Sequence, residues 1–184
     1  NTTLQTIPND VPYLRVPDRV KFQLPTASKS GIKVGLVWAG NPQHGADRAR
    51  SIPFRQLSPW WSAPGVTFYS LQVGPANKVL SQDRRTLPII NLEPHLTDFA
   101  VTAAAVRDLD LVICVDTAVA HLSGALGKPV WVLLPLAPDW RWLLEQPTSP
   151  WYPSARLFRQ QKAGDWSSVI ETVLAELAEF EKSR

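Results

Sequence analysis

The sequence predicts an α/β protein in which helices cover both faces of a mainly parallel sheet. Short apolar runs of strand length alternate along most of the chain with segments of helical spacing. The clearest unit is DLVICVDTAVAHLSGALGKPVWVLLP, residues 110–135: an apolar run, a short helical pattern stopped by Gly127, and a second apolar run. Because strand, helix and strand in this order connect parallel strands, we predict a three-layer α/β/α domain.

Composition agrees with a globular domain and excludes several functions. The 184 residues are 45% hydrophobic and 19% charged, and their net charge of +3 comes from scattered basic residues, so we expect no nucleic-acid partner. No apolar run approaches the ~20 residues that span a bilayer, and no signal peptide is visible. The single cysteine, Cys114, lies in an apolar run, as expected of a buried, inert thiol in the reducing cytoplasm.

Two units are expected along the chain. Residues 1–30 carry four prolines and no sustained period, which predicts an extended arm or interdomain linker lying against the domain of residues 31–184. The chain begins at Asn1 and contains no methionine, so we expect it to be part of a longer protein.

Within the domain, apolar runs predict strands at 33–38, 66–71, 87–92, 111–115, from 130, and at 156–159. Helical spacing, with capping residues at Thr97 and Asp165, predicts helices at 54–61, 75–82, 98–109, 117–126 and 166–180. A polar loop at 39–52 and a loop rich in proline and tryptophan at 135–153 complete the chain. The alternation is that of a Rossmann-like domain.

The first candidate site lies where the strand at 111–115 meets the following helix. Asp116 either caps that helix or, together with Thr117 and the N–H groups of Thr117 and Ala118, faces a pyrophosphate; both interpretations can hold at once. His121 shares a helix face with Thr117 and is either a hydrogen-bonded structural residue or a ligand contact. No Gly-x-Gly-x-x-Gly or Walker loop is present, which excludes simple dinucleotide and P-loop sites.

Loops at the same edge of the sheet supply further candidates. The loop at 39–52 offers the amide of Asn41, the ring of His44 and the guanidinium groups of Arg48 and Arg50, which match phosphate oxygens or are simply solvated.

Weaker candidates lie on three other loops. Gln72 ends the second strand and either turns the chain or contacts a ligand. In PLAPDWRW, residues 135–142, Asp139 is a candidate for sugar hydroxyls, while Trp140 or Trp142 either stacks on a ring or plugs the loop to the core. His95 lies beyond the third strand, where a base would be expected.

Several motifs together resemble a known family. In order along the chain stand GLVWAGNP (35–42), RSIP (50–53), SLQVGP (70–75), CVDTAVAHLSGALGKPVWVLLP (114–135), PDWRW (138–142) and SPWYPS (149–154). The pattern D-T-x-x-x-H-L-x-x-A-L-G-x-P, at 116–129, resembles the donor-binding half of glycosyltransferase family 9, the ADP-heptose–lipopolysaccharide heptosyltransferases and their relatives. The whole set is still more similar to the C-terminal region of bacterial tetratricopeptide-repeat proteins of that superfamily, over about residues 33–177.

The resemblance implies one half of a GT-B glycosyltransferase, the half that binds the nucleotide-sugar donor. Asp116, Thr117, Ala118 and His121 would then surround the diphosphate and sugar. The loop at 39–52 would contribute Asn41 and one of Arg48 or Arg50 to the phosphates, and His95 would lie near the base. The heptosyltransferases place an acidic ribose contact shortly after the second strand, where this chain has Ala76 and Asn77, so specificity for ADP is not implied.

The expected function is therefore transfer of a sugar from a nucleotide diphosphate donor to a glycan or protein acceptor, with inversion. No resident cofactor and no metal ion is expected, because the resemblance implies a GT-B enzyme, which neutralises the leaving diphosphate with a helix N-terminus and cationic side chains. The expected partner is the N-terminal half or repeat domain of the same polypeptide. Two alternatives are a non-catalytic module that binds a nucleotide sugar or a protein, and a hydrolase resembling nucleotide-sugar epimerases.

Overall fold

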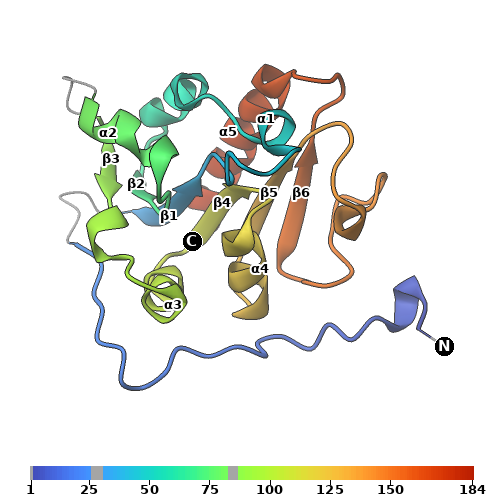
Figure 1. The fold of residues 1–184 in the computed structure, drawn as a ribbon, viewed down its shortest axis with the longest axis horizontal. Coiled ribbons are helices and arrows are strands. Elements are labelled where there is room, and N and C mark those ends of the chain that lie inside the picture. The colour runs from blue at the N-terminus through green and yellow to red at the C-terminus, as the bar shows by residue number, and fades with distance from the viewer. Residues whose placement is uncertain (1, 26–30, 83–86) are drawn as a thin grey trace.

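Six parallel strands form a single sheet at the centre of the computed structural model, which describes residues 2–25, 31–82 and 87–184 (Figure 1). The strands are β1 (Ile32–Val37), β2 (Val66–Ser70), β3 (Ile89–Asn91), β4 (Leu111–Val115), β5 (Val130–Leu134) and β6 (Ala155–Arg159). Their order, β3-β2-β1-β4-β5-β6, is that of the Rossmann fold, so the predicted fold class is confirmed. β6 and β3 are the two edge strands of the sheet.

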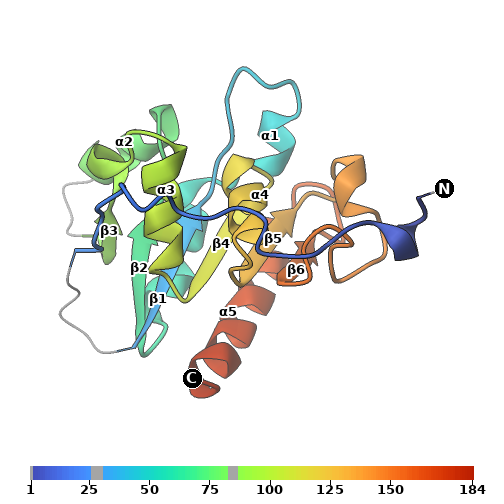
Figure 2. The ribbon, with the colours of Figure 1, turned by 90° about the horizontal axis from the view of Figure 1, so that it is seen from below.

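Helices and 3-10 turns connect the strands and cover both faces of the sheet (Figures 1 and 2). The α-helices are α1 (Asp47–Arg50), α2 (Lys78–Gln82), α3 (Phe99–Arg107), α4 (Ala118–Ala125) and α5 (Trp166–Lys182). The 3-10 turns are η1 (Leu4–Thr6), η2 (Phe54–Ser62), η3 (Pro75–Asn77), η4 (Glu93–His95) and η5 (Trp140–Trp142). None of the helices within these described residues is both long and apolar enough to cross a bilayer.

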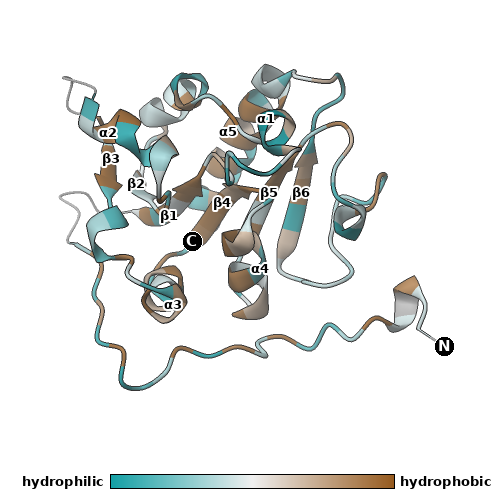
Figure 3. Ribbon diagram, in the orientation of Figure 1, coloured by the Kyte–Doolittle hydropathy of each residue, from teal (hydrophilic) through white to brown (hydrophobic). Residues whose placement is uncertain are grey.

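Two apolar cores, one on each face, hold the three layers together. α5 packs with η2 on one face, where Trp166, Val169, Ile170, Val173 and Leu177 form its buried stripe. α3 and α4 pack on the other face, and β4 and β5 are buried along their whole length between the two cores (Figure 3). A parallel strand covered on both faces needs apolar residues at every position, which is why these strands read as unbroken apolar runs. Cys114, on β4, is fully buried, and its burial raises the pKa of the thiol.

Three predicted elements differ in detail from the structure. The segment predicted as a helix at 54–61 is the 3-10 helix η2, which contains Pro59. A proline inside an α-helix removes a backbone donor and its ring clashes with the carbonyl four residues earlier, so the tighter 3-10 turn is favoured. The prediction that Thr97 caps α3 is wrong. Asp98 occupies the cap position, and its Oδ1 accepts from the N–H of Val101 at 2.8 Å. The short helix α1 lies inside the loop that the sequence predicts at 39–52.

The N-terminal segment runs as an extended strap across α3 and α4 (Figure 2). The N–H groups of Tyr13 and Leu14 both donate to the carbonyl oxygen of Ala125 at the end of α4. Farther along, the Tyr69 hydroxyl donates to the carbonyl of Pro25 at 3.0 Å. The predicted boundary of the arm at residue 30 lies outside the described residues.

Candidate functional site

A cleft of about 770 Å³ lies over the carboxyl ends of β1, β2 and β4. Chain connections leave β1 toward β2 and leave β4 toward β5, so the direction of winding reverses between β1 and β4. Ligands of open α/β sheets bind in the crevice at this reversal. Nine of the residues that the sequence offers for ligand binding line the cleft: Asn41, His44, Arg50, Gln72, Asp116, Thr117, Ala118, His121 and Asp139.

The amino end of α4 points into this cleft without a side-chain cap. Thr117 is the cap residue, with extended backbone (φ −143°, ψ 171°), and its own side chain accepts no capping bond from the first-turn N–H groups. The interpretation of Asp116 as the cap is therefore wrong, since it lies one residue too far from the helix. Uncapped first-turn N–H groups and the helix dipole together favour an anion at this point.

The Thr117 hydroxyl adds a second unsatisfied donor at the same place. Its Oγ1 is buried and has no hydrogen-bond partner within the part of the chain that the structure describes. A buried hydroxyl without a partner costs roughly 1–3 kcal/mol, so such groups are rare in proteins unless a ligand or water completes them. Thr117 lines the cleft, and a bound oxygen atom there would supply the missing partner.

His121 is held in one orientation by three neighbours. Its Nδ1 lies 3.0 Å from the Tyr152 hydroxyl, and its ring stacks on Trp142 at 5.2 Å between centroids. On the cleft side, Nε2 lies 3.9 Å from Asp116 Oδ1. Burial lowers the pKa of His121, and the nearby Asp116 carboxylate opposes this only in part. His121 is therefore predominantly neutral at neutral pH and presents Nε2 to the cleft.

The loop between β1 and α1 brings Arg50 into the cleft. Asp47 Oδ1 receives hydrogen bonds from Ser51 Oγ at 3.0 Å and, more weakly, from Arg50 Nε at 3.4 Å. A side chain at Gly40 would collide with Asp47 and Arg50, because a Cβ there would lie 2.6 Å from Arg50 Nη2. The glycine thus lets the loop fold tightly around the guanidinium and fix its position.

Arg48 and His95 do not line the cleft. Arg48 is on α1 like Arg50 but is exposed and lies outside the cleft lining. His95, in η4, is also exposed and packs against the ring of Phe22 from the arm, at 6.5 Å between centroids. Its neighbour Leu96 lines the cleft instead.

Gln72 and Asn41 line the cleft, but both side chains also shape the backbone. Gln72 Oε1 accepts from the N–H groups of Trp38 and Ala39, at 3.1 and 2.9 Å, and so fixes the end of β1. Asn41 Oδ1 accepts from the N–H of Gln43 at 3.0 Å, which forms a local turn. For Gln72 the interpretation as a turn residue is the one that these contacts favour.

On the opposite wall, Asp139 and Arg141 form a pair. Asp139 Oδ1 accepts from the backbone N–H and from Nη1 of Arg141, at 3.0 and 2.8 Å. Partial burial raises the pKa of Asp139, but the hydrogen bonds from Arg141 outweigh it and leave the pKa below its usual value. Of the two tryptophans in this loop, Trp142 is fully buried and plugs the loop to the core, whereas Trp140 is 66% exposed.

Two important residues were not among the sequence-predicted ones, Arg141 and Tyr152. Arg141 lies in PDWRW, from which the sequence analysis named only Asp139 and the tryptophans as candidates. Its guanidinium lines the cleft together with that of Arg50. Tyr152 stands 31 residues from His121, and only the fold brings them together. Among the described residues no group of three or more His, Cys, Asp or Glu side chains is arranged to hold a metal ion.

Hydrogen bonds between polar side chains hold the segment after β2 against the end of β3 and η4. Asn77 is buried; its Oδ1 accepts from Ser70 Oγ at 3.1 Å, and its Nδ2 donates to Asn91 Oδ1 and to Glu93. The other Glu93 oxygen accepts from the N–H of Gly74 at 2.7 Å. Both oxygens of this carboxylate are therefore engaged by the protein itself, at the place where the family resemblance would put a ribose contact.

The strand order and the cleft together define a Rossmann-like domain of the kind found in glycosyltransferases. The glycosyl transferase family 9 structure from Veillonella parvula superposes with a TM-score of 0.59 at 16% identity, over 86% of this chain and 48% of the other. The ADP-heptose lps heptosyltransferase II of E. coli superposes with a TM-score of 0.55 at 17% identity, over 85% of this chain and 48% of the other.

A third solved structure is similar to the same extent. The E. coli heptosyltransferase WaaC with ADP gives a TM-score of 0.54 at 14% identity, over 82% of this chain and 45% of the other. At such identities the likeness establishes a glycosyltransferase-like fold and nothing finer. The chain spans about half the length of each of these enzymes.

Sequence comparison adds one relative of greater length. Protein FlbA of Caulobacter vibrioides is 35% identical in an alignment of 161 residues that covers 83% of this chain but only 26% of FlbA. No protein-family model matches the chain.

Proposed function

We propose that this domain binds the nucleotide-diphosphate-sugar donor of a glycosyltransferase. The observation that carries the proposal is the convergence of four donors on one cleft: the uncapped amino end of α4, the unpartnered Thr117 hydroxyl, and the guanidinium groups of Arg50 and Arg141. Such a set suits a diphosphate, which needs several N–H and O–H donors and compensating positive charge.

The rest of the cleft suits the other parts of the same ligand. Apolar side chains also line the cleft and would pack against a nucleobase: Leu71, Val73, Pro75, Leu96 and Phe99. His121 and Asp139 line it as well, and would offer an imidazole and a carboxylate to the sugar. The volume of about 770 Å³ is within the ~300–1,000 Å³ typical of small-molecule sites.

In the proposed reaction the bond between the anomeric carbon and the diphosphate breaks while an acceptor hydroxyl bonds to that carbon from the opposite face. Negative charge grows on the departing diphosphate, so the helix end and the two arginines would stabilise it more as the bond breaks. The resemblance assigns activation of the acceptor to the other half of the enzyme. This domain would then supply donor binding and leaving-group stabilisation.

A titration with a matched pair of variants tests the proposal. Isothermal titration against ADP, UDP, GDP and CDP is expected to show binding of at least one diphosphate. Arg50→Ala should weaken that binding about 10-fold or more, because a charge-assisted hydrogen bond contributes about 1.5–3 kcal/mol. Arg48→Ala removes the same charge from the same helix, outside the cleft, and should leave the affinity unchanged.

Two outcomes would contradict the proposal. If none of the four diphosphates binds at millimolar concentration, the cleft is not a nucleotide-diphosphate site and the proposal fails. Equal losses in Arg48→Ala and Arg50→Ala would show general charge attraction in place of a defined cleft.

A further inference from the structure

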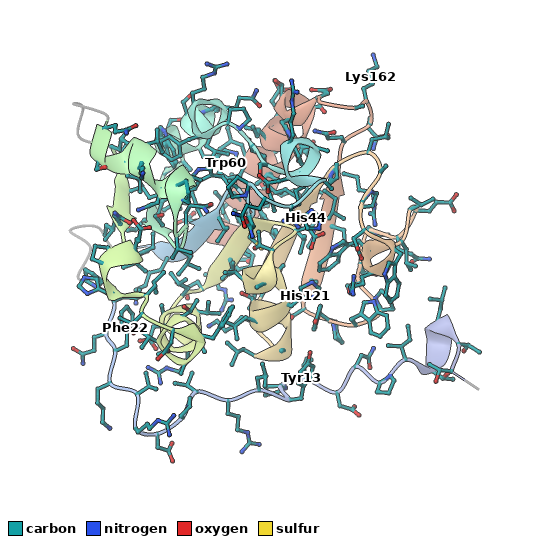
Figure 4. All side chains as sticks on the ribbon, viewed as in Figure 1. Tyr13, Phe22, His44, Trp60, His121 and Lys162 are labelled. Atoms are coloured by element: carbon teal, nitrogen blue, oxygen red, sulfur yellow. The ribbon has the colours of Figure 1, made fainter. Side chains whose placement is uncertain are left out.

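Tyr152 connects the N-terminal arm to the candidate site through His121. The Tyr152 side chain is 7% exposed and lies against α4, where Gly124 makes room for it: a Cβ on Gly124 would come within 2.3 Å of the tyrosine ring. Its hydroxyl meets His121 Nδ1 at 3.0 Å. Burial, and after it the arm residue Tyr13, raise the pKa of this hydroxyl, and Tyr13 lies where the arm passes α4 (Figure 4).

The surroundings of the ring decide which nitrogen carries the proton. The nearest charged group to Nε2 is the Asp116 carboxylate, 3.9 Å away, and a carboxylate favours an N–H at that nitrogen over a lone pair. With the proton on Nε2, Nδ1 is an acceptor, and the Tyr152 hydroxyl is its donor. The other charged groups that act on the ring, Arg141 and Asp139, shift its pKa in opposite directions.

We propose that Tyr152 is a positioning residue, which donates to His121 Nδ1 and thereby holds the Nε2–H of His121 aimed into the cleft as a hydrogen-bond donor to an oxygen of the bound ligand. Trp142, stacked on the same ring, prevents it from turning over. This inference rests on the proposed function for the identity of the ligand. The orientation and the proton position of His121 are testable without any ligand.

The first measurement is nitrogen NMR of the imidazole groups at about pH 8, where His121 is neutral because burial lowers its pKa. The signals of the three histidines are separated by comparison with His121→Gln. A proton on Nε2 and a hydrogen-bonded, unprotonated Nδ1 are expected. A proton on Nδ1 in the unmodified chain would overturn the proposal, whatever the variants do.

Tyr152→Phe then removes only the hydroxyl. Protonation of Nδ1 no longer breaks a hydrogen bond in this variant, so the pKa of His121 should rise; if Nδ1–H were the donor, the pKa would fall. Tyr69→Phe is the matched control, since Tyr69 is equally buried and its hydroxyl binds the Pro25 carbonyl away from the cleft. A fall in the pKa of His121, or equal shifts in both variants, would overturn the proposal.

Ligand binding completes the test. The diphosphate that binds best should bind Tyr152→Phe about 2- to 10-fold more weakly, as expected for one hydrogen bond, and Tyr69→Phe unchanged. Undiminished binding by Tyr152→Phe would overturn the positioning role. If no diphosphate binds the unmodified chain, the proposed function fails, and the NMR measurements still decide the role of Tyr152.

Discussion

At the scale of single residues, two threonines beside the cleft show opposite hydrogen-bonding states. Thr117 Oγ1 is buried and has no partner among the described residues, whereas Thr102 Oγ1 donates to the carbonyl of Asp98 at 2.8 Å at the start of α3. Because valine has the same shape as threonine, substitution removes the hydroxyl alone. The two positions therefore allow a hydroxyl that bonds within the protein to be compared with one that we propose binds a ligand.

Thr117→Val is expected to leave the free energy of unfolding unchanged or to raise it by about 1 kcal/mol, since it removes an unsatisfied buried group. The same change should weaken diphosphate binding about 10-fold, which corresponds to about 1.4 kcal/mol. Thr102→Val should lower the free energy of unfolding by about 1 kcal/mol. Urea unfolding and isothermal titration measure both quantities, and equal destabilisation by the two variants would show that Thr117 has an internal partner.

At the scale of elements, a single arginine organises the irregular segment at 135–153. Arg159, at the end of β6, donates from Nη1 to the carbonyl of Gln146 at 2.7 Å and from Nη2 to the carbonyls of Trp142 and Leu143. Burial lowers its pKa, because removal from water disfavours the charged guanidinium. These bonds fix η5 and with it Asp139, Arg141 and the ring that supports His121.

Arg159→Ala is expected to lower the free energy of unfolding by about 2–3 kcal/mol, because hydrogen bonds to a charged group are lost in a partly buried setting. Arg156→Ala is the control on the same strand: it breaks an exposed pair with Glu176 and should cost about 0–1 kcal/mol. Urea unfolding compares the two, and limited proteolysis should cut the 135–153 segment faster only in Arg159→Ala. Equal proteolysis of both variants would contradict the role of Arg159.

The sequence predicts the elements of this fold well and their side-chain networks poorly. All six strands are present within two residues of their predicted bounds, because strands buried on both faces must be apolar throughout. The α1 helix is too short to show a period, and at the start of α3 two adjacent residues, Thr97 and Asp98, are both good caps. The strand ends and the Asp-Thr pair predict the place of the site.

The parts of the site that sequence reasoning missed depend on contacts between distant residues. Nothing at Tyr152 in the sequence indicates His121, and nothing at Arg50 distinguishes it from Arg48 until the loop closes around Gly40. Both features depend on how the backbone folds, which a local sequence pattern does not predict.

At the scale of the whole molecule, the N-terminal arm is part of the second core. Val11, Phe22 and Leu24 pack against the α3–α4 face, and the backbone of the arm is bonded to the end of α4. The arm therefore acts as a fourth partial layer over that face, and its removal would expose apolar surface beside the site.

Phe22→Ala is expected to lower the free energy of unfolding by about 1–2 kcal/mol, as expected for a partly buried aromatic ring. Lys21→Ala, at the adjacent exposed position, should change it by less than about 0.5 kcal/mol. Thermal or urea unfolding monitored by circular dichroism provides the comparison. No difference between the two variants would mean that the arm is detached from the domain in solution.

Because Cys114 is buried, the folded chain should be almost unreactive toward thiol reagents. Its sulfur is out of reach of solvent and its thiolate is disfavoured, so a maleimide dye finds nothing to modify while the domain stays folded. A cysteine introduced at Val73 or Phe99, both more than half exposed on the rim of the cleft, would then be the single labelled atom. Nucleotides entering the cleft would be followed by the fluorescence of that one probe, on a chain otherwise left in its natural state.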